Sequence, residues 1–596
     1  MPPVRRLSTL IAWLRGSAVR SQLGVLVVYL ALGVLVTWPH ATYLAGKLPN
    51  IRDQGAYVWD MWWMAHQIEH FSWPYTTTLL WAPAGAPLAY HALMPLLGVL
   101  MFPITITLGP AFSVTLFSVA LPGLIAYAMY RAARLWLEPL PAFASGAFFG
   151  LSSMVDWRTW FHENLAAGIL FLPIVLEAAV RLRRDPSRGR AAVLGLLLGL
   201  MLCVDQESTV MGVIVVAVVL AHWLLPRPMW RNLGLLGLAA GVSVIVAIPQ
   251  IIAMIEQSAA LGQPQAKLGL DFVSGSAALP QLFEPSPRVG AFGLSGLAKL
   301  YYEGKTTEGM ATFGVTLTIL ALLGALVGWR RRRERTWLAL WLCDCVLALG
   351  PVVFLGGQAH TLFGTEYDGQ QLSVLMPYTW FVRLPAMTSF RYASRFTPLG
   401  LLAASLLAGS AVAWIRARRA AALVPVAAIA ALELGWSTPT PDGTMPAGLP
   451  AVDRAIAADH SHSVVVDVPL GFRSGIRNVG APFPPEEEVE ATLDGHPRAI
   501  GYLARMSAGT AVALTTHPFY TDLIAMQFGR PTTPAQIAAA KLDAERINVG
   551  WVLVWPHRRH QAPGLNPATL VTFLSETGFT LRYRADGVSV YQRVRG

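Results

Sequence analysis

Acidic and basic side chains stand at the ends of long apolar segments in this sequence, and their types suit acid–base and phosphate chemistry. A carboxylate can take the proton of a hydroxyl group. Arginines bind phosphate and stabilise negative charge on a departing group. The pattern therefore predicts a site for group transfer. The candidate residues are Asp53, His162, Glu163, Asp205, Glu207, Arg383, Arg391 and Arg395.

Composition indicates that the elements positioning these side chains are membrane helices. Of the 596 residues, 54% are hydrophobic and only 13% are charged. Several apolar runs reach the roughly 18 residues that a helix needs to cross a bilayer. Only helices and closed barrels satisfy the backbone in lipid, and these runs are of helical length without strand-like alternation. The formal charge of +11 lies mostly in short loops between apolar runs, which favours membrane topology over nucleic-acid binding.

The basic loops orient these helices. The arginines before the first span place the N-terminus in the cytoplasm and Asp53 outside. Every later basic cluster then falls on the cytoplasmic side. The predicted fold is a polytopic α-helical protein of the inner or plasma membrane with about eleven transmembrane helices. The expected spans are residues 23–44, 111–130, 141–155, 165–180, 191–204, 209–225, 233–254, 309–329, 337–355, 392–415 and 420–434.

Residues 51–70 form the first of two interfacial helices expected in the outer loop after the first span. Aromatic side chains suit the headgroup layer, and Asp60 is interpreted as marking the wet side of this helix. An acid at the mouth of a membrane helix is costly to leave near lipid, which makes Asp53 the stronger functional candidate. The aromatic residues are Tyr57, Trp59, Trp62 and Trp63.

Residues 91–109 form the second interfacial or re-entrant segment. The segment is apolar enough to be counted as a span, but counting it would put the later basic loops on the wrong side of the membrane. Pro95 and Pro103 are expected to break it.

After residue 440 the membrane pattern ends, which divides the chain into a transmembrane domain, residues 1–440, and a soluble extracytoplasmic α/β domain, residues 441–596. The acidic run of residues 486–490 is interpreted as a solvated edge. Strands are expected at residues 464–468 and 549–555, helices at residues 534–546 and 568–577, and a hairpin at residues 581–591.

Several candidate residues have a plain structural alternative. Asp205 and Glu207 suit the cap of the next helix, and His162 with Glu163 suits another cap. Arg391 and Arg395, four residues apart, could be interfacial arginines whose head groups reach water. These alternatives stay open beside the functional interpretation.

The arrangement resembles the GT-C superfamily of integral-membrane glycosyltransferases, which use polyprenyl-phosphate sugars. The resemblance rests on a first span followed by a long outer loop with an acid, Asp53, and on two interfacial helices in that loop. The segment of residues 87–93 resembles the family's motif before the second of these helices, and a soluble domain follows the last span. The resemblance implies an inverting transfer in which Asp53 acts as base on the acceptor hydroxyl.

On this interpretation the protein moves a sugar from a polyprenyl-phosphate donor to a glycan, lipid or protein acceptor of the cell envelope. Arg391 and Arg395 would hold the donor phosphate, with Arg383 in reserve, and acidic side chains would orient hydroxyl groups. The expected partners are this donor, this acceptor and the bilayer, with no nucleic acid. No cofactor and no protein-bound metal site are expected, and a divalent cation is the one open alternative. The competing hypotheses are a lipid or glycan transporter or flippase, and a non-catalytic envelope assembly protein. The residues assigned to orient hydroxyl groups are Glu163, Asp205 and Glu207.

Overall fold

A computed structural model of the chain separates into two compact units. Unit 1 consists of residues 1–42, 117–247 and 264–440, and unit 2 of residues 43–116, 248–263 and 441–596. The structure describes residues 17–50, 53–221, 230–261, 273, 275–283, 311–355, 358–367, 370–384, 387, 390, 392–436, 443–474, 478–481, 486–556 and 562–594. The division into domains at residue 440 stays a prediction, but the second unit combines the first loop with the segment after residue 440.

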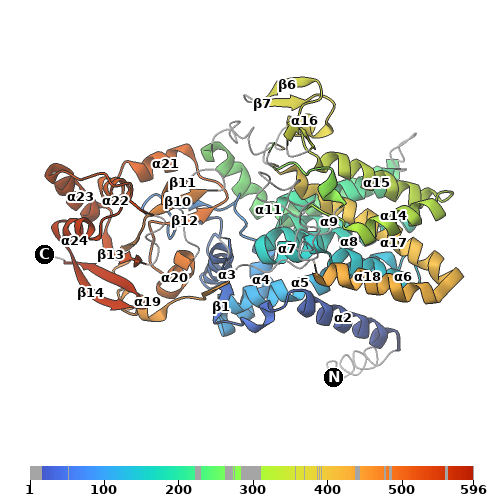
Figure 1. The fold of residues 1–596 in the computed structure, drawn as a ribbon, viewed down its shortest axis with the longest axis horizontal. Coiled ribbons are helices and arrows are strands. Elements are labelled where there is room, and N and C mark those ends of the chain that lie inside the picture. The colour runs from blue at the N-terminus through green and yellow to red at the C-terminus, as the bar shows by residue number, and fades with distance from the viewer. Residues whose placement is uncertain are drawn as a thin grey trace. The chain divides into compact units, whose positions relative to one another are not determined.

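Unit 1 is helical, and α17 (Thr397–Arg419) lies at its centre (Figure 1). Its side chains from Thr397 to Val412 are buried, and it packs against α6 (Pro139–Gly150), α14 (Val315–Val327) and α15 (Arg332–Ala348). A second group is formed by α8, α9 and α10, in which α8 contacts both of the others. The bounds of the remaining helices are α2 (Ser17–Val36), α5 (Pro110–Ala133), α7 (Ser153–Phe161), α8 (Glu163–Arg184), α9 (Arg188–Leu202), α10 (Gln206–Leu220), α11 (Trp230–Leu261), α16 (Pro377–Phe381) and α18 (Leu423–Trp436).

Four helical stretches of the described chain are long and apolar enough to cross a membrane, namely residues 110–133, 163–184, 232–258 and 393–434. Shorter apolar helices cover Ser21–Val36, Pro95–Leu108, Gln206–Leu220 and Val315–Val327. The apolar helices agree with a membrane protein, while the total of about eleven spans stays a prediction.

The first loop forms α3 (Gln54–Glu69), as expected, but its surroundings differ from the prediction. Trp59 and Trp63 are buried, and Asp60 is fully buried rather than marking a wet side. The helix packs against α4 (Pro95–Leu108) and α20 (Glu486–Asp494), both within unit 2. Protein contacts, not a headgroup layer, therefore cover most of its surface.

The second apolar segment of the loop is a continuous helix, which corrects the expectation that its prolines break it. Pro95 is the first residue of α4, where its missing N–H costs nothing. Pro103 lies inside the helix. The helix ends at Leu108 and is followed by Gly109, whose φ of +90° favours glycine. Helix α5 begins at the next residue, Pro110.

After residue 440 the chain forms a four-stranded sheet in the order β14-β15-β13-β9. Its strands are β9 (Val464–Val468), β13 (Val549–Val554), β14 (Phe579–Ala585) and β15 (Val588–Arg593). The inner strand β13 pairs in parallel with β9 and antiparallel with β15. The expected strands, the hairpin at Asp586 and Gly587, and the helices α23 (Pro534–Arg546) and α24 (Pro567–Glu576) are confirmed.

A single hydrophobic core joins the first loop to the segment after residue 440 within unit 2. It includes Trp59, Trp81 and Leu88 of the loop together with Val466 and Phe519 of the later segment. Polar contacts add to it, since Trp81 Nε1 donates to the Gly501 carbonyl and Tyr520 Oη donates to the Ala82 carbonyl. Short strands also pair, β1 (Lys47–Pro49) with β8 (Thr444–Pro446). These contacts explain why α3 is buried.

The remaining elements of unit 2 complete this core. The end of α11 binds the loop through Gln257, which accepts from the Ala89 N–H and donates to the Tyr75 carbonyl. A three-stranded sheet has the order β11-β10-β12. The other elements are β10 (Gly471–Ser474), β11 (Asn478–Gly480), β12 (Gly501–Leu503), α19 (Pro450–Ala457), α21 (Ala508–Thr515) and α22 (Pro518–Gln527).

Candidate functional site

The acid expected to act as base lies at the beginning of α3 in unit 2. Asp53 occupies the N-cap position, is partly exposed, and forms no side-chain capping hydrogen bond. Asp60 follows two turns later, and a spacing of seven residues places both carboxylates on one face of the helix. The local sequence thus places a partly exposed carboxylate and a buried one on the same face of α3.

His91 contacts the buried carboxylate. Its Nε2 lies 3.2 Å from Asp60 Oδ1, and both side chains are shielded from solvent. The Ala504 N–H donates to His91 Nδ1 at 3.3 Å. A neutral imidazole that accepts at Nδ1 carries its proton at Nε2, the nitrogen that faces Asp60. The contact fixes the side chain of Asp60, which lies on the same face of α3 as Asp53.

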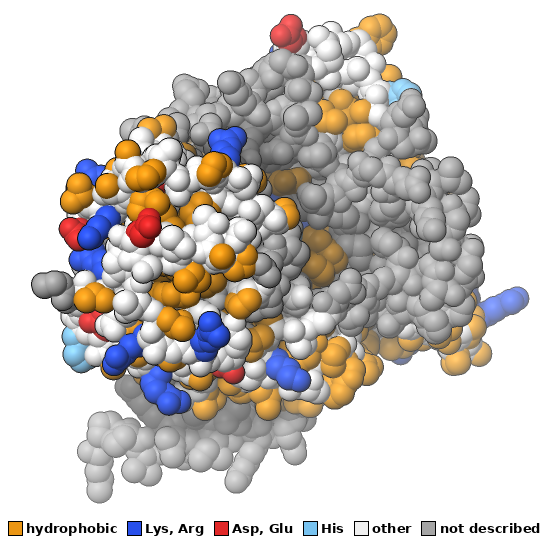
Figure 2. Space-filling view, turned by 60° about the vertical axis from the view of Figure 1, so that its left-hand side comes forward, with side chains coloured by type: hydrophobic (Ala, Val, Ile, Leu, Met, Phe, Trp, Pro, Cys, Tyr) orange, Lys and Arg blue, Asp and Glu red, His pale blue; other side chains and the backbone are white. Residues whose placement is uncertain are grey.

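The acidic run of residues 486–490 lies inside unit 2, which corrects its interpretation as a solvated edge. Glu487, Glu488 and Glu490 are each at most 1% exposed. The run begins α20, and the packing of α20 on α3 removes these side chains from solvent. On the face that Figure 2 draws, hydrophobic and basic side chains are more frequent than acidic ones among the described atoms.

In unit 1 the structure brings together two candidate residues that are far apart in the sequence. Arg395 Nη1 donates to Glu207 Oε1 at 2.9 Å, and both side chains are mostly shielded. The guanidinium of Arg395 also lies over the ring of Tyr392, with 4.7 Å between Cζ and the ring centroid. The ion pair orients a guanidinium group that a phosphate could engage by replacing the carboxylate.

Asp205 is a helix cap, as its structural alternative proposed. It is the N-cap of α10, and its Oδ2 accepts the Ser208 N–H at 2.6 Å. Burial and the neighbouring charge of Glu207 raise the pKa of Asp205 to about 6, against the opposing effects of the Ser208 hydrogen bonds and Arg395.

His162 and Glu163 lie at the junction of α7 and α8. His162 forms no side-chain capping hydrogen bond, so the capping alternative does not hold for its imidazole. Glu163 is buried, and its Oε1 accepts from the Ser118 hydroxyl at 3.4 Å. Glu163 thus contacts α5, while the Glu207 carboxylate pairs with Arg395.

Of the two remaining candidate arginines, the structure describes Arg383. Arg383 Nη2 donates to Thr365 Oγ1 at 3.2 Å, and its guanidinium stacks on Trp380 at 4.9 Å. These contacts tie it to the hairpin of β6 (Gly364–Tyr367) and β7 (Gln370–Ser373). Arg391 lies outside the described residues.

Sequence reasoning did not identify His91 as a contact of Asp60 or Glu488 as a buried acid. His91 lies in the segment of residues 87–93 that carried the family resemblance, so a signal was available there. A run of three consecutive glutamates gives no such signal, because this sequence pattern is typical of solvated helix ends. Across the described residues there is no group of three or more His, Cys, Asp and Glu side chains able to hold a metal, and the expectation of no cofactor stays a prediction.

Comparison with known proteins assigns the fold. Residues 19–434 match the model of a family described as Domain of unknown function (DUF6311). No curated protein matches the chain. Among solved structures, arabinofuranosyltransferase AftD from Mycobacteria is similar, with 15% identity and a TM-score of 0.60, over 96% of this chain and 40% of that chain. The chain therefore spans well under half the length of this relative.

Two further structures have lower TM-scores. The oligosaccharyltransferase AglB from Archaeoglobus fulgidus, in complex with an inhibitory peptide and a dolichol-phosphate, has 12% identity and a TM-score of 0.48, over 96% of this chain and 74% of that chain. ArnT from Cupriavidus metallidurans, bound to undecaprenyl phosphate, has 13% identity and a TM-score of 0.42, over 96% and 98%. The similarity to AftD confirms the resemblance to the GT-C superfamily at the level of the fold.

Proposed function

The chain belongs to the DUF6311 family, and we propose that it is a membrane glycosyltransferase that moves a sugar from a polyprenyl-phosphate donor to an envelope glycan, lipid or protein. The observation that carries the proposal is the partly exposed Asp53 at the beginning of α3, on the same face as the buried Asp60 that contacts His91. The GT-C fold supports glycosyl transfer as the class of reaction.

Asp53 is the base in this proposal. It takes the proton of an acceptor hydroxyl, the hydroxyl oxygen forms a bond to the anomeric carbon of the sugar, and the bond from that carbon to the phosphate oxygen breaks. The polyprenyl phosphate leaves with the bonding electrons, and the anomeric configuration inverts. Asp60 and His91 contact each other on the face of α3 that carries Asp53. In this proposal they fix the packing on that face, and neither accepts nor donates a proton during the transfer.

The role of the arginines is proposed separately. Arg395 is oriented by Glu207 and by the ring of Tyr392. A bidentate guanidinium suits the phosphate of the donor, and this contact stabilises the charge that develops on the leaving group. Arg391 and Arg383 stay proposals for the same role. The extracytoplasmic side is the proposed location of the reaction, following from the distribution of basic loops.

The decisive experiment compares variants of the purified full-length protein in lipid nanodiscs. Radiolabelled polyprenyl-phosphate sugars are supplied with a panel of envelope glycans and lipids, and transfer is measured. Asp53→Asn is expected to lower the rate by about 10²- to 10⁴-fold, the range of a lost general base. The matched control is Asp185→Asn, an exposed aspartate between α8 and α9, which is expected to act like the wild type. Wild-type rates in Asp53→Asn would remove Asp53 from the mechanism.

A further inference from the structure

Large apolar side chains are exposed on the hairpin of β6 and β7 and on the short helix α16, both in unit 1. Phe363 is 76% exposed, Leu375 60% and Trp380 50%. In Figure 1 the hairpin and α16 stand out from the helices of unit 1. A contiguous group of such side chains, unlike a single exposed leucine, marks a binding surface. We call this group the apolar surface, and its members are Leu362, Phe363, Leu375, Trp380 and Leu384.

Hydrogen bonds join the members of the apolar surface. The Val374 N–H donates to the Phe363 carbonyl at 3.0 Å, and the Trp380 Nε1–H donates to the Val374 carbonyl at 2.8 Å. Leu375 follows Val374 directly, and Leu362 precedes Phe363. These side chains therefore belong to one surface rather than to scattered positions.

The inner side of the same segment is anchored to the ends of two helices of unit 1. Leu372, Ser373 and Tyr378 are fully buried. The Ser373 N–H donates to the carbonyl of Pro351, shortly after α15, and the ring of Tyr378 packs edge-on against Phe396 at 6.2 Å between centroids. Phe396 directly precedes α17, which is part of a stretch long and apolar enough to cross a membrane. The apolar surface is thus tied to the end of a candidate membrane helix.

The residue types at this surface suit the boundary between lipid and water. The guanidinium of Arg383 stacks on Trp380 and donates to Thr365, which belongs to the hairpin. Tryptophan is enriched at this boundary because its ring has an apolar body and a polar edge. Arginine keeps its apolar stem near lipid while its guanidinium binds phosphate. Phospholipid headgroups therefore match both the apolar and the basic parts of the surface.

The hairpin also has a polar face, which distinguishes its two sides. Thr365 pairs with Leu372, and Glu366 pairs with Gln371 in the next position. Successive residues of a strand point to opposite faces of the hairpin. Leu372 is buried toward unit 1, whereas Glu366 and Gln371 are exposed. Glu366 therefore provides an exposed reference position on the same hairpin.

We propose that the apolar surface docks on the phospholipid headgroup layer, on the side of the membrane where α17 begins. The leucines and Phe363 would lie just below the headgroups, with the Arg383 guanidinium at the level of the lipid phosphates. Docking would hold Tyr378 against the 3-10 helix Ala393–Phe396, which carries Arg395. The inference goes beyond the proposed glycosyl transfer and does not depend on it.

Fluorescent labels on single cysteines test the docking without an enzymatic assay. Phe363→Cys, Leu375→Cys and the control Glu366→Cys are introduced one at a time into the full-length protein after its native cysteines have been replaced. The labelled proteins are placed in nanodiscs of phosphatidylcholine and phosphatidylglycerol, whose lipids carry a nitroxide quencher either near the headgroup or at the end of the acyl chain. Thermal unfolding like that of the wild type shows that the background is folded. The replacements in the background are Cys203→Ala, Cys343→Ala and Cys345→Ala.

The expected result is selective quenching from the headgroup region. The labels at residues 363 and 375 should be quenched at least about twofold more than the label at residue 366, and more by the headgroup quencher than by the acyl-end quencher. Equal quenching at the three positions, or stronger quenching from the acyl end, would overturn the proposal. Unquenched labels together with disulfide-linked dimers of Phe363→Cys would assign the surface to a second copy of the chain and would also overturn it.

Discussion

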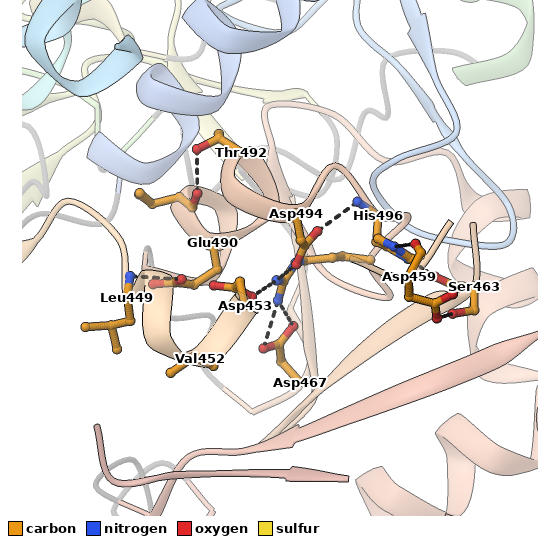
Figure 3. Close-up of polar contacts among 12 residues, drawn as sticks. Leu449, Val452, Asp453, Asp459, Ser463, Asp467, Glu490, Thr492, Asp494 and His496 are labelled. Carbon is orange, nitrogen blue, oxygen red and sulfur yellow. Dashed lines mark hydrogen bonds and ion pairs between the residues drawn. The ribbon is translucent and has the colours of Figure 1, made fainter. Parts of the chain in front are cut away.

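Unit 2 contains two buried groups of carboxylates, and their partners differ. In the first group, Arg498 is fully buried and binds Asp467, Asp453 and Asp494. Figure 3 shows these three aspartates pointing toward one another, with Glu490 beside them. The Trp555 Nε1–H adds a donor to Asp467. In the second group, Asp60 and Glu488 have no arginine partner in the described chain, and His91 is the imidazole in contact with Asp60.

The difference distinguishes a structural network from a candidate site. A buried guanidinium offers several donors in fixed geometry, so Arg498 donates to Asp467, Asp453 and Asp494 and joins α19, β9 and α20. The second group leaves buried carboxyl oxygens without hydrogen bonds next to a partly exposed acid. Proteins tolerate such local cost mainly where function requires it. Substitutions in the first group should therefore lower the free energy of unfolding, whereas substitutions in the second group should lower the rate of transfer.

The largest expected effect is that of Arg498→Met on stability. The substitution removes a guanidinium group that contacts three buried aspartates. Breaking such a buried pair typically costs about 3–5 kcal/mol in the free energy of unfolding. Chemical unfolding of the full-length protein measures this cost. Arg546→Met is the control, because Arg546 is mostly exposed and pairs with Asp543, so at most about 1 kcal/mol is expected. Similar losses in the two variants would remove the distinction between buried and exposed pairs.

Asp60→Asn should show the opposite behaviour. Its carboxylate is buried without an arginine, so a neutral amide of the same shape should leave the free energy of unfolding unchanged or raise it. Transfer should fall by about 10²-fold, because the contact that orients the surroundings of Asp53 is altered. Parallel measurements of unfolding and of transfer rate check both expectations. A loss of stability comparable to that of Arg498→Met would place Asp60 in a structural network instead.

The smallest effect concerns the pH dependence of the Arg498 group. Burial and the neighbouring Glu490 carboxyl raise the pKa of Asp453, against the opposing charge of Arg498. Since the folded pKa is raised, the stability contributed by this proton is present in acid and is lost as the pH rises above the ordinary range of an aspartate. Asp453→Asn should reduce the alkaline decline by up to about 1.4 kcal/mol per pH unit. Melting curves at several alkaline pH values test this, and an unchanged slope would contradict it.

Local patterns were sufficient for several elements. The run of β-branched residues at 464–468, the turn at Asp586 and Gly587, and the apolar periodicity of α23 and α24 depend on neighbours in sequence. All were predicted with nearly the observed bounds. The prolines of α4 were less informative, because a proline at the first position starts a helix as readily as it ends one. The resemblance to the GT-C superfamily likewise followed from the order of spans, loop helices and acid.

The amino-acid sequence by itself determined the membrane character of the chain, the helix that carries Asp53 and Asp60, and the candidate arginines. Hydropathy is read from neighbouring residues, and the sides of the loops follow from the rule that basic loops lie in the cytoplasm. Only the tertiary structure decided which acids are buried and which partners they have. Glu207 meets Arg395, Asp60 meets His91, and Glu488 reaches α3 across some 400 residues of chain. Such pairs depend on how segments distant in sequence pack together. A run of glutamates in a sequence is compatible with a solvated helix end and with buried acids, and only the packing distinguishes the two.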